Sequence, residues 1–122
     1  MKKLAKALLI AGLAFAGWPH LAGAQAPDAR TKRTFKAKCA ACHGEDGKGQ
    51  TAQARQKFGG LRDLSDPAVQ KRFDDAKLKE IVQKGLTETK DGKEIKMPAT
   101  PEIAGEQLDG MVRFVRGLAG GK

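Results

Sequence analysis

Apolar side chains recur at helical spacing in several short stretches, and polar segments that contain glycine separate these stretches. The clearest stripe lies near the C-terminus, where the spacing is i, i+3, i+4, i+7 and i+10: Leu108, Met111, Val112, Val115 and Leu118. This spacing predicts a closing segment that begins at residues 100–102 and is helical through Leu118.

Aspartates precede three further apolar stretches and predict helix N-caps. We expect helices over residues 29–38, 67–73 and 76–84, capped in turn by Asp28, Asp66 and Asp75. The intervening residues 44–62 hold five glycines and many polar side chains, which predicts a long loop that covers a site. No strand is needed, so the expected fold class is all-α with one folded domain.

The chain begins with the pattern of a secretory signal peptide. Three lysines precede the apolar run 7–18, Pro19 ends the run, and alanines stand at positions 22 and 24. A permanent membrane anchor is the alternative, but these 12 residues would span only about 18 Å of helix against a hydrocarbon core of about 30 Å. We therefore expect residues 1–24 to be cleaved after Ala24. The mature domain, residues 25–122, would then be exported without a permanent membrane anchor, most simply to the periplasm.

Removing residues 1–24 changes the composition. Residues 25–122 hold 20 basic and 14 acidic residues, a net charge of +6, and only 17 of these 98 residues are Leu, Ile, Val or Phe. That fraction, about 17%, lies below the level of roughly 20% at which charged chains become disordered, so we expect a cofactor to complete the core. The basic residues are interleaved with acidic ones and lack an aromatic platform, so no nucleic acid partner is expected.

Residues 39–43 read Cys-Ala-Ala-Cys-His, which is the c-type haem attachment signature. Two thiols at this spacing can add to the two vinyl groups of a porphyrin as thioethers, and His43 then presents its imidazole to the iron. The rival interpretations are a disulfide and a thioredoxin-like dithiol, of which the second needs a βαβ setting. A zinc site would need four ligands, and residues 25–122 offer three candidates. We therefore expect one haem c, attached at Cys39 and Cys42, with His43 as the proximal iron ligand.

A second axial ligand would come from Met97, Met111 or a lysine. Met97 precedes Pro98 in a segment outside any helical pattern, where we expect a loop. Met111 stands in the middle of the apolar stripe of the closing helix, a position typical of the core. Met97 is therefore the favoured distal iron ligand.

With these residues in this order, the chain resembles the class I monohaem c-type cytochromes, small soluble bacterial proteins, over about residues 29–119. The resemblance rests on six residues: Cys39, Cys42, His43, Met97, Phe35 and Phe114. It implies a cytochrome c fold of about four to five short helices around one covalently attached haem, with the N- and C-terminal helices crossing near the two phenylalanines. Many relatives have a proline that supports the proximal histidine. This chain has Phe-Gly-Gly-Leu at residues 58–61 instead, so the resemblance does not extend to that support.

Histidine–methionine ligation leaves the iron no open position and raises its reduction potential, which is typical of electron transfer. The expected function is that of an exported monomeric electron carrier, not an enzyme, which moves one electron between a donor and an acceptor protein. The alternatives are a haem subunit of a larger oxidoreductase and a haem enzyme or gas sensor with a labile sixth ligand. Four lysines are candidates for a ring that attracts acidic partner surfaces, or they only solvate loops: Lys48, Lys57, Lys93 and Lys96.

Overall fold

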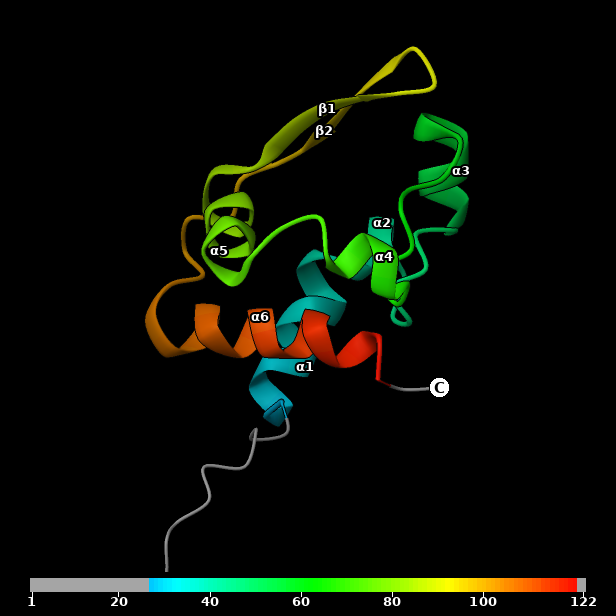
Figure 1. Cartoon of the computed structure of the whole chain (residues 1–122). Coiled ribbons are helices and arrows are strands. Elements are labelled where there is room, and N and C mark those ends of the chain that lie inside the picture. The colour runs from blue at the N-terminus through cyan, green and yellow to red at the C-terminus, as the bar shows by residue number, and fades with distance from the viewer. Residues whose placement is uncertain (1–26, 121–122) are drawn as a thin grey trace, which may run out of the picture.

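The computed structural model describes residues 27–120, which fold mainly into helices (Figure 1). The elements in chain order are α1 (Ala29–Lys38), α2 (Ala40–His43), α3 (Ala52–Phe58), α4 (Pro67–Gln70), α5 (Asp75–Lys84), β1 (Leu86–Lys90), β2 (Lys93–Met97) and α6 (Gly105–Leu118). The predicted signal peptide lies outside the described residues. Between residues 27 and 120, no helix has the length and apolar character needed to cross a membrane.

The core lies where α1 and α6 cross, as Figure 1 shows. The rings of Phe35 and Phe114 meet there at a centroid distance of 4.6 Å and an interplanar angle of 46°. Phe35 also packs in one buried cluster with Ile103, Leu108 and Met111. The crossing and the core position of Met111, which is 1% exposed, therefore agree with the sequence analysis.

Helix caps follow the sequence closely, with one shift. Asp28 accepts a hydrogen bond from the Thr31 N–H at 2.6 Å, and Asp66 accepts one from the Ala68 N–H at 2.8 Å. The cap of α5 is Asp74 rather than the predicted Asp75, since Asp74 accepts the Lys77 N–H at 2.7 Å. The preceding helix is shorter than expected, because α4 ends at Gln70 rather than at residue 73.

The segment predicted as one long loop, residues 44–62, contains the short helix α3, so that prediction was wrong in part. Thr51 caps this helix by accepting the Ala54 N–H at 3.1 Å, and Gly59 ends it with φ +70°. At the other end of the chain, residues 100–104 are not helical and α6 begins only at Gly105.

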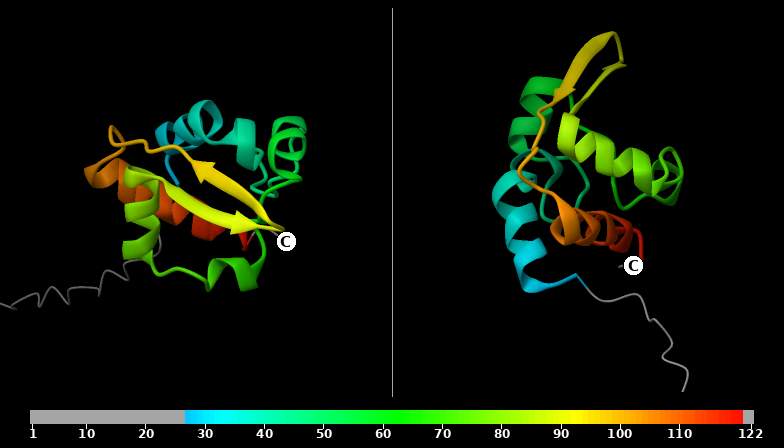
Figure 2. Two further views of the ribbon diagram at one scale, coloured as in Figure 1. Left: turned by 90° about the horizontal axis from the view of Figure 1, so that it is seen from above. Right: turned by 90° about the vertical axis from the view of Figure 1, so that its left-hand side faces the viewer.

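The two-stranded antiparallel sheet contradicts the prediction that the chain needs no strand. Its turn is Asp91-Gly92, with φ of +51° and +73°, the backbone that a tight hairpin requires. The strands pair Leu86 with Met97 at the end nearest the helices. Figure 2 shows this hairpin extending from the helical part of the molecule. Met97 is therefore the last residue of β2, not a loop residue.

Candidate haem site

One mainly apolar cavity of about 190 Å³ opens between the helices and the hairpin. The ends of α1 and α5, helix α2, residues 58–64, the hairpin and residues 97–100 all contribute to its wall. Apolar side chains on the wall include Phe58, Leu61, Leu64, Ile81, Leu86 and Ile95. Cys39, Cys42, His43 and Met97 line the same cavity, so the fold brings together all four residues that the sequence analysis selected.

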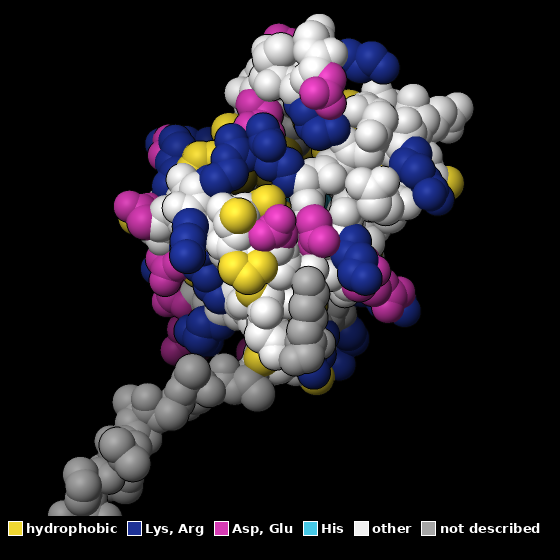
Figure 3. Space-filling view, turned by 45° about the vertical axis from the view of Figure 1, so that its right-hand side comes forward, with side chains coloured by type: hydrophobic (Ala, Val, Ile, Leu, Met, Phe, Trp, Pro, Cys, Tyr) yellow, Lys and Arg dark blue, Asp and Glu magenta, His cyan; other side chains and the backbone are white. Residues whose placement is uncertain are grey.

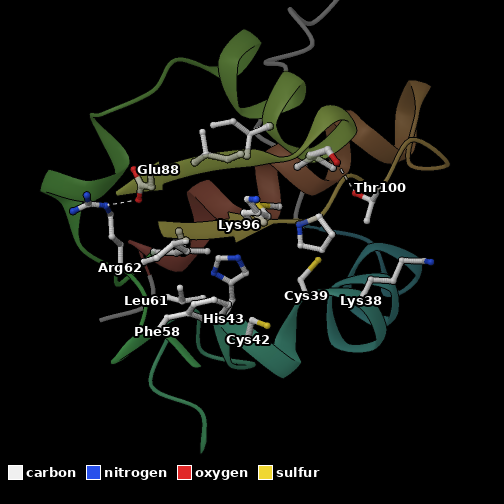
Figure 4. A pocket seen from close by; sticks show the side chains of 17 residues that line it. Lys38, Cys39, Cys42, His43, Phe58, Leu61, Arg62, Glu88, Lys96 and Thr100 are labelled. Atoms are coloured by element: carbon white, nitrogen blue, oxygen red, sulfur yellow. Dashed lines mark hydrogen bonds and ion pairs between the residues drawn. The ribbon is translucent and has the colours of Figure 1, made fainter. Parts of the chain in front are cut away.

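Cys39, Cys42 and His43 occupy one short helical turn. Cys39 ends α1 and begins α2, and its carbonyl accepts the His43 N–H at 2.9 Å. Figure 4 shows the three side chains together on one side of the cavity, with Glu88 and Lys96 of the hairpin on the other. Both thiols are free and half-buried, so the structure contains no disulfide between them.

The environment of Cys39 disfavours a redox-active dithiol. Burial raises the pKa of the Cys39 thiol, while Lys38 lowers it and Cys42 raises it further. Reactive cysteines need the opposite shift, because the thiolate is the nucleophile. The raised pKa of Cys39 therefore disfavours a site that exchanges disulfides through a reactive thiolate.

The imidazole of His43 is suited to bind a metal that is not part of the polypeptide. Burial lowers its pKa, which favours the neutral ring that metals bind. Its Nδ1 atom is buried and has no hydrogen-bond partner among the described residues. A ligating histidine usually donates its second ring N–H to a carboxylate or carbonyl. The missing partner agrees with the absence of a supporting proline from the Phe-Gly-Gly-Leu segment.

Charged groups at the cavity were mostly missed by the sequence analysis. Arg62 Nε donates to Glu88 Oε1 at 3.0 Å, and Arg72 reaches the other carboxylate oxygen at 3.2 Å. Burial opposes ionisation of Glu88, but the hydrogen bonds from both arginines outweigh it, so the pKa of Glu88 lies below its ordinary value of 4.5. The alternation of residues along the strand could have predicted that Glu88 faces the cavity. No pattern in the sequence predicts that Arg62 and Arg72 pair with Glu88, because they come from distant parts of the chain.

Of the four lysines considered for a ring, only Lys96 lines the cavity, where Lys38 is a second ammonium group. Lys96 pairs with Glu94 at 2.9 Å, and Lys38 pairs with Glu102 at 2.6 Å. The side chains of Lys38 and Lys96 are 43% and 69% exposed, so these pairs are surface ion pairs of small energetic value. The cations at the cavity suit a group that carries carboxylates, as the two propionates of haem do.

The sequence model of the cytochrome c family matches residues 28–119. No curated protein matches the sequence significantly. Membership implies a covalently bound haem c with iron, and the residues present fit that group: two free thiols, a half-buried imidazole with an unpartnered nitrogen and an apolar wall on one cavity. The fold, the cavity and the match over residues 28–119 together show that the chain belongs to the cytochrome c family.

Proposed function

We propose that this protein is an exported carrier of single electrons, with its haem attached at Cys39 and Cys42 and its iron ligated by His43 and Met97. One observation carries the proposal: the attachment turn and Met97, which lie far apart in the sequence, line the same cavity. Members of the cytochrome c family use haem for electron transfer. Histidine and methionine together leave an iron without an open coordination position, which favours a carrier over an enzyme.

The residues of the chain have separate tasks in this proposal. The two thioethers would fix the macrocycle, and His43 would hold the iron from the side of α2. The apolar wall would exclude water from the macrocycle, so that little solvent would reorganise during electron transfer. The haem supplies the one-electron chemistry, and the protein sets its position and its potential.

The proposal includes export to the periplasm, with residues 25–122 as the mature chain. It is supported by the charged and apolar pattern of residues 1–24 and by the family, whose haem domain is typical of exported proteins. N-terminal sequencing of the protein purified from its natural host tests the cleavage after Ala24.

The partners would be redox proteins with acidic docking surfaces, which a monomer of net positive charge attracts. Figure 3 shows basic and acidic side chains interspersed over most of one face, with several Lys and Arg side chains gathered in its upper part. The groups to test are the two lysines that line the cavity, Lys38 and Lys96, and the other lysines of the proposed ring, Lys48, Lys57 and Lys93. Association rates that fall as salt rises would support steering, and rates independent of salt would contradict it.

The experiment that tests the ligand assignment is the ferric absorption spectrum of Met97→Ala. Wild-type protein should show the weak long-wavelength band of a sulfur–iron bond, and the variant should lack it. Met111→Leu is the matched control, because it removes the other candidate sulfur from the buried core at similar volume and should keep the band. A band that persists in Met97→Ala and vanishes in Met111→Leu would overturn the assignment. A wild-type protein without the band would favour the enzyme or sensor alternative.

A further inference from the structure

The C-terminal end of α5 lies against the backbone that follows Met97. Gly85 ends this helix with φ +81°, and its N–H donates to the Ile81 carbonyl at 2.8 Å. A Cβ atom built on Gly85 would lie 2.5 Å from the Met97 carbonyl oxygen and 3.1 Å from the Ala99 nitrogen. The two backbones therefore approach each other more closely than any residue with a side chain allows.

Thr100 holds the same segment three residues farther along. Its N–H and its hydroxyl both donate to the Val82 carbonyl, at 2.9 and 2.6 Å. This carbonyl belongs to the last turn of α5, where the helix leaves its acceptors without partners. Thr100 thus satisfies an open acceptor of α5 and ties residues 97–100 to the helix end.

The hairpin holds Met97 from the other side. Met97 pairs with Leu86, the residue directly after Gly85, in the strand register. Three contacts therefore hold the backbone of Met97 and of the segment after it: the pairing of β1 with β2, the close approach of Gly85, and the hydrogen bonds of Thr100 to α5. All three contacts depend on where α5 ends.

We propose that Gly85 and Thr100 are positioning residues that keep the Met97 side chain at its place in the haem cavity. The proposal rests on the proposed function, because it takes Met97 as the iron ligand. Neither residue needs to touch the iron. Each acts through the backbone of residues 97–100, which the end of α5 holds in place.

The magnitude follows from the contact distances. Ordinary contacts of a Cβ atom begin at 3.4 Å, so a methyl group on Gly85 must displace the Met97 carbonyl by about 0.9 Å. A displaced Met97 backbone moves the point from which its side chain reaches into the cavity, and metal sites tolerate only small changes in ligand distance, so we expect a weakened sulfur–iron bond.

The test compares Gly85→Ala with Gly59→Ala in the haem-loaded protein. Gly59 also ends a helix with positive φ, at +70°, but nothing lies within 4 Å of its Cβ position. Both variants place a Cβ atom on a residue with positive φ. The backbone of Gly85, with ψ −179°, is more strained for alanine than that of Gly59, with ψ +22°, so the comparison uses the haem spectrum and not stability; only Gly85→Ala meets the Met97 backbone. Gly85→Ala should lose most of the sulfur–iron band and should bind added imidazole at least about tenfold more tightly than Gly59→Ala, because the iron is more often without Met97. Equal bands and equal imidazole affinities in the two variants would overturn the proposal.

Thr100 supplies a second test if Gly85→Ala fails to fold. Thr100→Val removes the hydroxyl at nearly constant volume, and Thr100→Ser keeps it. Thr100→Val should lose the band on heating well before its helical circular dichroism melts, while Thr100→Ser should behave as wild type. If band and helix melt together in Thr100→Val as in wild type, Thr100 has no positioning role.

Failure of the ligand assignment and failure of the positioning proposal give different results. If Met97→Ala keeps the band, the proposed function loses its ligand and this inference falls with it. If Met97→Ala loses the band but neither Gly85→Ala nor Thr100→Val changes it, the ligand assignment stands and the inference alone is wrong.

Discussion

Gly110 stands where α6 crosses α1, and its replacement by alanine measures how tightly the two helices pack. A Cβ atom on Gly110 would lie 2.7 Å from Thr31 Oγ1, and Thr31 is only 1% exposed. Alanine is favoured over glycine in a helix interior by about 1 kcal/mol. Overpacking a well-packed contact costs about 1–3 kcal/mol, and Thr31 has no solvent to move into. We therefore expect Gly110→Ala to lower the free energy of unfolding by about 1 kcal/mol net.

Gly117→Ala is the matched control, because Gly117 lies on the same helix with nothing within 4 Å of its Cβ position. It should raise the free energy of unfolding by about 0.5–1 kcal/mol through helix propensity alone. The difference between the variants, about 1–3 kcal/mol, then isolates the contact with Thr31. Urea unfolding of the haem-loaded proteins, followed by far-ultraviolet circular dichroism, measures both values. If Gly110→Ala is as stable as Gly117→Ala, the close crossing is refuted.

Two further predictions concern the haem and the acidic limit of stability. A Cys39→Ala, Cys42→Ala variant produced without haem should be largely unfolded, because only 17 of residues 25–122 are Leu, Ile, Val or Phe and the apolar wall of the cavity would then face water. A haem-free variant with native circular dichroism and a cooperative melt would contradict this. Glu88→Gln should lower stability at pH 7 by at most about 1 kcal/mol, because it weakens the pairs with Arg62 and Arg72, whose side chains are about a third exposed. The folded-state pKa of Glu88 is lowered, so this stabilisation is complete above pH 4.5 and is lost as pH falls through the lower, folded-state value. Urea titrations across this range should show the difference from wild type closing, and a constant difference down to pH 3 would refute the linkage.

Local signals in the sequence predicted much of the helical structure. Asp28 and Asp66 cap the helices expected of them, because an aspartate carboxylate before a helix accepts the free N–H groups of its first turn. The predicted cap of α5, Asp75, was wrong by one residue, because the neighbouring Asp74 is equally able to accept the N–H groups of the first turn and does so. The apolar stripe of α6 placed Met111 in the core, where burial confirms it.

The hairpin was missed although its signal was present. Asp91-Gly92 is a strong turn pair, and residues 86–90 alternate between half-buried and exposed positions. Such a short alternation is easily read as a loop, and a search for helical periodicity does not find it. The error matters at the site, because the strand register, not a loop, places Met97.

The sequence by itself predicted the chemistry of this protein: two thiols and an imidazole stand at the spacing of haem attachment, and the low content of apolar residues led us to expect a cofactor in the core. These are local or compositional properties, so no knowledge of the fold is needed to see them. The sequence already favoured Met97 over Met111, and the tertiary structure places Met97 on the cavity with His43; only the tertiary structure decided that Arg62 meets Glu88 there. It also decided that the end of α5 lies against residues 97–100. Contacts between residues distant in the chain depend on how helices and strands pack, and packing has no signature in a short stretch of sequence.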